Sequence, residues 1–331
     1  MNKRIVSSLS LILITTTLCI AWGPWGHTHI NKAAIFALPE EMRVFFYDHA
    51  DFLTEESVVP DIRKYTLNDK AEFPRHFINS EGYNTDIDKI PRSNKEAYQK
   101  YDSAFLQQNG ILPWYIQDMM VKLTNAFKSG RKSEILFLAG DLGHYLGDAN
   151  MPLHTSINHN GQLTNQVGIH ALWESQLPEY FGSAYNLTVS DVVYIKDINT
   201  EVWRIIKHTH SLADTLLLAE RNLKATFPKD KIYKTDSTGN VVKAKPGRTA
   251  YSYEYAQAYH KALHGMVEAQ MREAIRDVAN FWYTAWVNAG SPNMNDLDSE
   301  EVPKAHKEAY EKELKLWKKG KLAEIKLQNE F

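Results

Sequence analysis

Hydrophobic residues recur every three or four positions through most of the chain, and the alternating pattern of a half-buried strand is almost absent. This pattern predicts a series of helices, with few signals for strands and no internal repeat. One helix is predicted to begin near residue 29 or 30. Further helices are predicted over 95–108, 113–128, 134–150 and 170–178, with one or two over 191–227 and a long core helix over 251–290.

Polar stretches rich in glycine and proline separate these helices. Ser133 is a predicted N-cap for the helix over 134–150, and Pro178 is predicted to end the helix that precedes it. Asp61 and His76 both lie in irregular sequence near prolines, where a scaffold presents ligands from loops. The predicted loops and linkers are 22–28, 80–92, 155–168 and 229–248. Of these, 80–92 and 229–248 are predicted to lie at the surface, the last as a loop or a short hairpin.

The first 21 residues have the pattern of a secretory signal peptide. Two basic residues precede an apolar run over 5–20, and the small Ala21 marks a cleavage point that leaves Trp22 as the mature N-terminus. Cleavage before Cys19, followed by lipidation, is the alternative. The sequence therefore predicts a secreted or periplasmic protein, with a signal peptide at 1–21, one domain at 22–299, and a charged helical or disordered tail at 300–331.

Composition limits the classes of function. The chain has 331 residues, of which 44% are hydrophobic, so it can bury a large core. Its net charge of −2 argues against a generally basic nucleic-acid coat. Removal of the signal peptide also removes the only cysteine, so disulfides contribute nothing to the mature chain, and its core and any bound metals must stabilise it.

Three histidines and two carboxylates cluster in one segment of the chain. His144 and Asp148 are one helical turn apart, as are His170 and Glu174, so each pair shares a helix face and can hold one ion. His154 lies between the pairs. Imidazole with carboxylate suits zinc or a similar cation. The alternative is a set of surface ion pairs, and the spacing alone leaves the number of ions open.

Together with the residues near the mature N-terminus, this segment resembles the superfamily of zinc-dependent phospholipases C and fungal single-strand-specific nucleases. The fragments WGPWGH, PDIR, RHF, HYLGD, PLH and HALWE match its metal motifs in order, from residue 22 to about 180. The nine matching positions are Trp22, His27, Asp61, His76, His144, Asp148, His154, His170 and Glu174.

The resemblance implies an all-α domain with three zinc ions at the bottom of a cleft. It assigns Asp61, His76, His144 and Asp148 to one ion. It assigns His154, His170 and Glu174 to a second, and the Trp22 amino nitrogen and carbonyl, His27 and a bridging Asp148 to a third. A free α-amino group has a pKa of about 7.7 to 8.0, low enough for a metal to displace its proton.

The implied activity is hydrolysis of phosphate esters by in-line attack of zinc-bound hydroxide, with Asp61 as the catalytic residue that steers the nucleophile. Arg63 or Arg75 is a candidate for neutralising phosphate oxygens, or a surface charge. The alternative function is a non-catalytic, zinc-stabilised secreted protein that binds phosphorylated ligands.

The substrate implied is single-stranded nucleic acid, a nucleotide or a phospholipid. H-x-x-x-E at 170–174 matches the phospholipase branch, but Trp25 and Ile62 stand where choline-recognising members have an acidic and an aromatic residue. Phe77 and Asn79 are the candidate substrate-binding residues, because Phe77 can stack on a base. Transient contact with a membrane surface is also expected, and no feature of the sequence indicates a protein partner.

Overall fold

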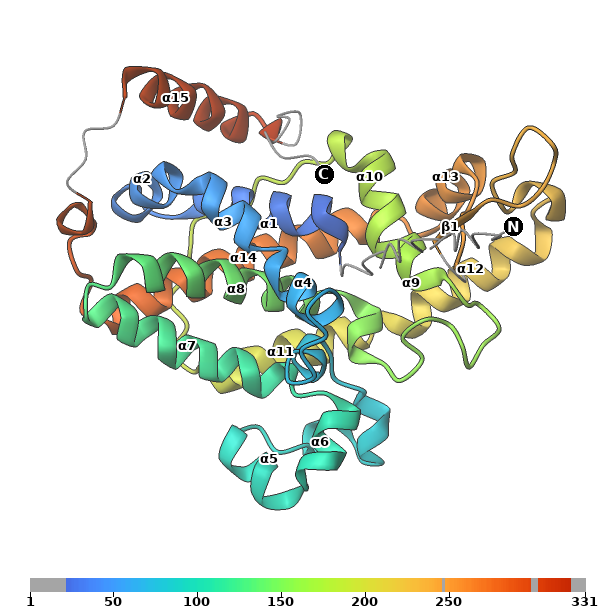
Figure 1. Ribbon diagram of the computed structural model, residues 1–331, viewed down its shortest axis with the longest axis horizontal. Coiled ribbons are helices and arrows are strands. Elements are labelled where there is room, and N and C mark those ends of the chain that lie inside the picture. The colour runs from blue at the N-terminus through green and yellow to red at the C-terminus, as the bar shows by residue number, and fades with distance from the viewer. Residues whose placement is uncertain (1–21, 246–247, 299–302, 323–331) are drawn as a thin grey trace, which may run out of the picture.

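The computed structural model describes residues 22–245, 248–298 and 303–322. Helices make up nearly all of its regular structure, which confirms the predicted all-α fold (Figure 1). The first helices are α1 (Gly23–Ala37), α2 (Glu40–Asp48), α3 (Ala50–Glu56), α4 (Val59–Tyr65), α5 (Asn94–Lys100), α6 (Ser103–Asn109), α7 (Leu112–Lys128) and α8 (Lys132–Ala149).

The later helices flank a two-stranded antiparallel hairpin of β1 (Lys243–Lys245) and β2 (Arg248–Thr249), so one of the two predictions for 229–248 is confirmed. These helices are α9 (Ile169–Ala171), α10 (Leu177–Phe181), α11 (Ile198–His210), α12 (Ala213–Thr226), α13 (Tyr253–Ala262), α14 (Met266–Asn288) and α15 (Lys304–Lys318).

Short helical turns connect the longer helices. Seven are 3-10 turns, and η5 is π-helical. They are η1 (Phe73–His76), η2 (Ser80–Tyr83), η3 (Ile87–Lys89), η4 (Pro152–Thr155), η5 (Leu172–Gln176), η6 (Gly182–Ala184), η7 (Lys229–Lys231) and η8 (Met294–Leu297).

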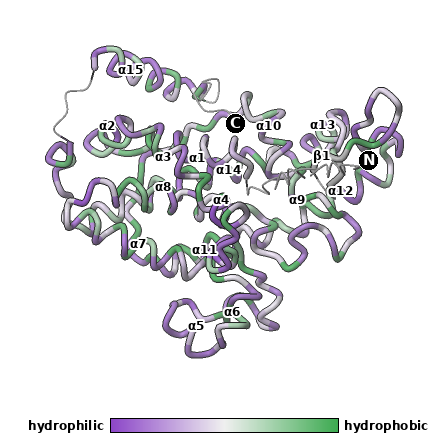
Figure 2. The backbone as a smooth tube through the Cα atoms, in the orientation of Figure 1, coloured by the Kyte–Doolittle hydropathy of each residue, from purple (hydrophilic) through white to green (hydrophobic). Residues whose placement is uncertain are grey.

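Helices α1, α8 and α14 form the centre of the molecule, with α3 and α7 packed against them. Trp114, Trp173 and Trp282 are fully buried among these and neighbouring elements. The outer helices contain both apolar and polar residues, so green and purple segments both occur along each of them in Figure 2. None of the described helices combines the length and the apolarity that a membrane span requires.

Three glycines let other elements approach α8 closely. A Cβ atom at Gly140 would lie 2.7 Å from Glu56 Cβ, and one at Gly143 would lie 2.0 Å from Asn31 Oδ1. At Gly147 the nearest atom, His27 Nδ1, would be 3.1 Å away. The absence of these side chains allows α1 and α3 to pack directly on α8, which carries two of the candidate metal ligands.

Several predicted boundaries were wrong. The loop at 22–28 is the first turn of α1, because Pro24 is tolerated in a first helical turn. The predicted helix over 95–108 is split into α5 and α6, since Asp102 caps the second of them. The helix over 251–290 breaks at Gly265, where φ is +83°.

Three local predictions near the metal motifs were also wrong. Helix α8 begins at Lys132, so Ser133 is a helical residue and not its cap. Asp61 lies in α4 and not in irregular sequence. The chain remains helical through Pro178, because the π-helical η5 is followed directly by α10, whose first turn accepts the proline.

The tail contains α15, as predicted, although its face toward the core is not fully solvated. Trp317 is buried against Phe36, and Lys32 Nζ lies 2.9 Å from Glu313 Oε2. The predicted signal peptide at 1–21 and the end of the tail lie outside the described residues. The division of the chain at residue 299 stays a prediction.

Candidate metal centre

Eight candidate metal-binding side chains meet at the centre of the fold, although seven different elements carry them. All are buried except His170, which is partly exposed. Helix α1 carries His27, α4 carries Asp61, η1 carries His76, α8 carries His144 and Asp148, η4 carries His154, α9 carries His170, and η5 carries Glu174. Trp22, directly before α1, is fully buried beside them.

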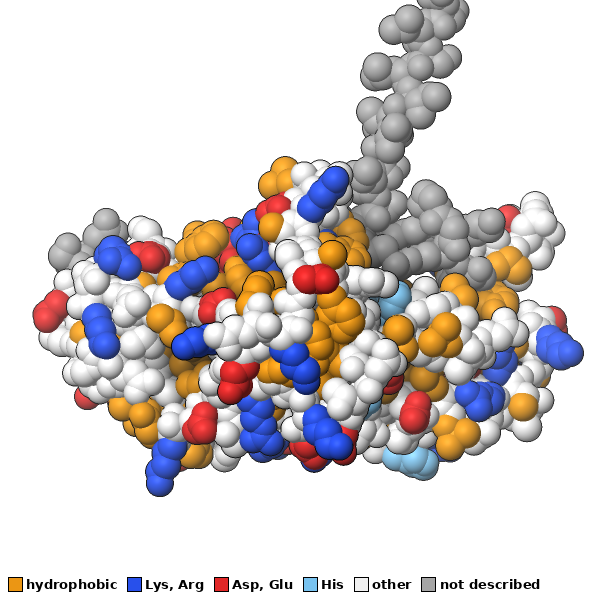
Figure 3. Space-filling view, turned by 90° about the horizontal axis from the view of Figure 1, so that it is seen from below, with side chains coloured by type: hydrophobic (Ala, Val, Ile, Leu, Met, Phe, Trp, Pro, Cys, Tyr) orange, Lys and Arg blue, Asp and Glu red, His pale blue; other side chains and the backbone are white. Residues whose placement is uncertain are grey.

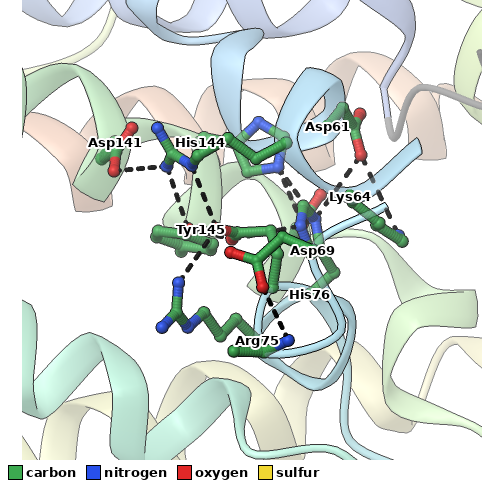
Figure 4. Close-up of polar contacts among 12 residues, drawn as sticks. Asp61, Lys64, Asp69, Arg75, His76, Asp141, His144 and Tyr145 are labelled. Atoms are coloured by element: carbon green, nitrogen blue, oxygen red, sulfur yellow. Dashed lines mark hydrogen bonds and ion pairs between the residues drawn. The ribbon is translucent and has the colours of Figure 1, made fainter. Parts of the chain in front are cut away.

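The first set lies around Asp148. His76 Nδ1 is 2.9 Å from Asp148 Oδ2 and 3.6 Å from Asp61 Oδ1. His144 Nε2 is 3.3 Å from Asp148 Oδ2 and 3.0 Å from His76 Nδ1. In Figure 4, Asp61, His76 and His144 point toward one another. The structure therefore brings together the four residues that the sequence assigned to the first ion.

The second set lies around Glu174. Its Oε1 is 3.0 Å from His170 Nε2, and its Oε2 is 3.5 Å from His154 Nε2. The rings of His154 and His170 are stacked with their centroids 5.0 Å apart. These three side chains provide three ligand atoms within reach of one ion.

The residues assigned to a third ion lie between the other two sets. His27 Nε2 is 3.6 Å from Asp148 Oδ1, the oxygen that faces away from His76 and His144. The backbone nitrogen of Trp22 lies 3.2 Å from Glu174 Oε2. The Trp22 carbonyl accepts a hydrogen bond from Gly26 N, and a carbonyl oxygen has a second lone pair.

Backbone carbonyls set the tautomers of three histidines. The Nδ1 atoms of His144, His154 and His170 lie 2.7, 2.6 and 2.6 Å from the carbonyl oxygens of Ser57, His76 and His159. A nitrogen facing a carbonyl must carry the proton, so the Nε2 atom of each ring has the free lone pair that a metal requires. In each ring that Nε2 atom points into the cluster.

The distances between the ligand atoms fit zinc. Two atoms each about 2.0–2.1 Å from one tetrahedral zinc lie roughly 3.3–3.4 Å apart. The separations within the three sets, from 2.9 to 3.6 Å, bracket this value. Asp148 Oδ1 is buried and accepts no hydrogen bond from the described residues, which suits an oxygen that a cation would satisfy.

Burial shifts the pKa values of the histidine and aspartate ligands in opposite directions. It lowers the pKa of His144 to about 3 and that of His76 well below its usual value, so both rings are neutral and can ligate. It raises the pKa of Asp148 to about 7. For Glu174, burial raises the pKa, but His170 and His154 in their protonated forms outweigh it, by charge and by hydrogen bonds, and lower the pKa. A cation bound at Asp148 would stabilise the ionised carboxylate, which burial disfavours.

A pocket of about 310 Å³ opens beside the cluster. Seen from below, the surface is hollowed near its middle, where hydrophobic side chains gather and a histidine lies beside them (Figure 3). The residues that line the pocket include His76, His154, His170 and Glu174 from the two outer ligand sets, and both Phe77 and Asn79. The predicted substrate residues therefore lie next to the predicted metal ligands.

Comparison with known proteins identifies the family. The sequence profile of the family described as "Zinc dependent phospholipase C" matches residues 26–231, more than half of the chain. The chain belongs to this zinc-dependent phospholipase C family. The family match and the ligand clusters agree on zinc binding, and the family match indicates hydrolysis of phosphate esters.

Two further comparisons add little beyond this family. No curated protein matches the sequence. Among solved structures, the chain is similar to "Alpha Toxin from Clostridium Absonum", with 14% identity, coverage of 84% of this chain and a TM-score of 0.44. The matched region spans 66% of the length of that toxin chain.

Sequence reasoning missed a carboxylate in this phospholipase C-family site. Glu72 is fully buried, and its Oε1 lies 3.5 Å from His76 Nε2. It also accepts hydrogen bonds from Arg63 Nε, Arg75 Nη1 and the Tyr145 hydroxyl. The spacing of Glu72 and His76, one helical turn apart, is the same signal that revealed the two metal-binding pairs.

The contacts of Arg63 and Arg75 indicate whether either of them can neutralise phosphate oxygens in the pocket. Arg63 Nη2 lies 2.5 Å from Asp141 Oδ2, and the Arg75 guanidinium lies over the Tyr115 ring, 4.5 Å from its centroid. Neither arginine lines the pocket, whereas Lys64 does. The two guanidiniums support the scaffold behind His76, and Lys64 is the cation that faces the pocket.

Proposed function

We propose that this chain is a secreted phospholipase C-type phosphodiesterase that uses three zinc ions to cleave phospholipids on the glycerol side of the phosphodiester. One observation carries the proposal. His154, His170 and Glu174 line the pocket yet offer only three protein ligands, and a structural zinc is usually closed by four. A fourth position at this edge would face the pocket, where a phosphoryl oxygen or water can enter.

The nine residues have distinct proposed roles. Asp61, His76, His144 and Asp148 hold one ion, His154, His170 and Glu174 a second, and Trp22, His27 and the second oxygen of Asp148 a third. Bound zinc lowers the pKa of water and stabilises charge on phosphoryl oxygens. Asp61 would act on the water near phosphorus, since it is assigned to the first ion and its Oδ1 lies 3.9 Å from Nζ of the pocket-lining Lys64.

Signal cleavage after Ala21 is part of the proposal. Trp22 is fully buried, and its nitrogen lies 3.2 Å from Glu174 Oε2, so a new amino terminus would form inside the ligand cluster. A free amine has the lone pair that a peptide nitrogen lacks. Processing would therefore complete the proposed third zinc site within the domain at 22–299.

The composition of the pocket favours a lipid over a nucleic acid. Tyr65, Phe73, Phe77 and Leu153 give it apolar walls, and the family match is to the phospholipase C branch. The Phe73 and Phe77 rings pack edge to face with their centroids 5.3 Å apart. This arrangement leaves less of the Phe77 face for stacking on a base than an isolated ring would offer.

The test is a parallel assay of the chain that begins at Trp22. Short-chain phospholipids, single-stranded nucleic acid and nucleoside 3′-phosphates are each incubated with zinc, with a chelator, and with zinc restored after the chelator. We expect release of a phosphorylated head group and diacylglycerol, which is lost with the chelator and regained with zinc. Cleavage of nucleic acid alone would reassign the substrate, and no hydrolysis of any substrate would favour the non-catalytic zinc-binding alternative.

A further inference from the structure

Lys64 places its ammonium group in the wall of the pocket. It lies one helical turn after Asp61 in α4, and its Nζ is 3.9 Å from Asp61 Oδ1 (Figure 4). Only 7% of its side chain is exposed, although lysines usually extend into solvent. The buried stem fixes the charge close to the position that a substrate would occupy.

The ammonium group of Lys64 lies over two aromatic rings that line the same pocket. Lys64 Nζ lies 4.5 Å from the centroid of the Tyr65 ring and 5.5 Å from that of the Phe73 ring. Aromatic faces attract cations, and a quaternary ammonium ligand is usually held by such faces. Here the faces of Tyr65 and Phe73 are occupied by a cation of the protein itself.

The Asp61 carboxylate beside Lys64 does not line the pocket and is assigned to a zinc ion, and the charges that do line the pocket do not offset Lys64. Among the described residues that line it, Lys64 is the only lysine or arginine, and Glu174 is the only aspartate or glutamate. Glu174 is committed to His154 and His170. The side chains that line the pocket therefore offer no free carboxylate to a cationic head group, whereas they present one ammonium to an anionic group.

We propose that Lys64 makes the pocket selective for phosphodiesters whose head group, with its phosphate, has a net negative charge, and that it excludes quaternary ammonium head groups. The inference rests on the proposed function, since it names the class of phospholipid that the site takes. Lys64 acts on selectivity in two ways, by attracting an anionic group and by repelling a cationic one. Trp25 and Ile62, which stand where choline-recognising members have an acidic and an aromatic residue, do not line this pocket.

The test compares kcat/KM for dihexanoyl phosphatidylglycerol and dihexanoyl phosphatidylcholine, both kept below the concentration at which they form micelles. Wild type should prefer the anionic lipid by at least about tenfold, and Lys64→Met should reduce that ratio by about tenfold. Lys64→Arg should retain the preference. Lys70→Met is the matched control, because Lys70 is exposed in the connection that follows α4, and it should leave the ratio unchanged.

A preference of the wild type for phosphatidylcholine, or an unchanged ratio in Lys64→Met, would overturn the inference. A uniform loss on both lipids would do the same, because it would indicate a structural role for Lys64. The ratio within one variant is insensitive to the fraction of protein that is folded.

A second series separates this inference from the proposed function. It uses p-nitrophenyl phosphodiesters whose other ester group is choline, its neutral isostere 3,3-dimethylbutanol, or a carboxyethyl alcohol. Suppose that no phospholipid is cleaved, but that the diesters are hydrolysed fastest when the ester group is anionic and slowest when it is cationic. If Lys64→Met removes this order of rates, the lipid assignment fails and the role of Lys64 stands. If none is hydrolysed, their affinities for the zinc-loaded protein are measured by calorimetry. Equal affinities for the anionic, neutral and cationic diesters would then reject the inference.

Discussion

Glu72 Oε1 lies 3.5 Å from His76 Nε2, while the opposite nitrogen of the same ring, Nδ1, lies 2.9 Å from Asp148 Oδ2. Both side chains are fully buried. His76 Nε2 makes no hydrogen bond within the described residues, so the nearby Glu72 carboxylate favours a proton on Nε2 by its charge, which leaves the lone pair of Nδ1 facing the ligand cluster. By contrast, His144, His154 and His170 face backbone carbonyls with their non-ligating nitrogens.

Glu72→Gln should weaken zinc binding by about 10–100-fold at the site that contains His76, because an amide stabilises the ligating tautomer less than a carboxylate does. Competition with a chelator of known affinity, on protein that circular dichroism shows to be folded, measures this effect. Glu41→Gln, at an exposed position of α2, is the control. Equal zinc affinity in the Glu72 variant and the wild type would remove Glu72 from the metal centre.

Retention of one residue before Trp22 should reduce the zinc content from three ions to two. With Ala21 still attached, the nitrogen of Trp22 is a peptide nitrogen whose lone pair is delocalised, so it cannot replace a free amine as a ligand. Zinc per chain is measured by mass spectrometry of the metal after dialysis, with the chain that begins at Trp22 as the reference. Three ions and full phosphodiesterase activity in the extended chain would contradict the assignment of the third site.

Gly143→Ala should destabilise the fold. The new methyl group would lie 2.0 Å from Asn31 Oδ1, and Asn31 is fully buried where its Nδ2 donates to the carbonyl oxygens of Leu53 and Gly140. Overpacking of this kind costs about 1–3 kcal/mol, which exceeds the gain in helix propensity of about 1 kcal/mol. Urea unfolding of the metal-free chain measures the difference.

Gly147→Ala gives the informative contrast in the same helix. Its methyl group would meet His27 Nδ1 at 3.1 Å, so a small shift of that ring would accommodate it. This variant should lose less stability than Gly143→Ala, yet bind the third zinc more weakly. If Gly147→Ala proves the less stable of the two, the packing described for α1 on α8 is wrong.

The structure brings together the two pairs of candidate ligands that the sequence indicated, because the strongest signals of the sequence are local. His144 with Asp148, and His170 with Glu174, each need only one helical turn to share a face, and a helix formed in both places. The long-range part, which brings α1, α4 and η1 onto α8, was available only from the resemblance to a known superfamily. Spacing within one segment says nothing about which distant segment packs on it.

Several of the predictions that failed depended on how glycine and proline were weighed. Gly23 and Pro24 indicated a loop, but a first helical turn tolerates both. Gly265 interrupts a hydrophobic pattern that continues on both sides of it, so periodicity alone predicted one helix instead of α13 and α14. The position of Lys64 in the pocket depends on the packing of η1 beside α4, and no local pattern contains that information.

Asp277→Asn should stabilise the protein more at pH 8 than at pH 5. Asp277 is buried in α14, where Asn150 Nδ2 donates to it at 2.9 Å and Arg204 Nη2 lies 3.6 Å away. Burial raises its pKa from 3.8 to about 7. Between these values the folded chain keeps a proton that the unfolded chain has released, so stability falls as the pH rises toward 7.

An asparagine at position 277 stays neutral at every pH, so it avoids this loss, which approaches about 4 kcal/mol above pH 7 for a shift of this size. Thermal unfolding of the variant and the wild type at both pH values measures the gap between them. Asp214→Asn, at an exposed position in the first turn of α12, should show the same gap at pH 5 and pH 8. A pH-independent gap for Asp277→Asn would mean that Asp277 is ionised in the fold, with Arg204 supplying the compensating charge.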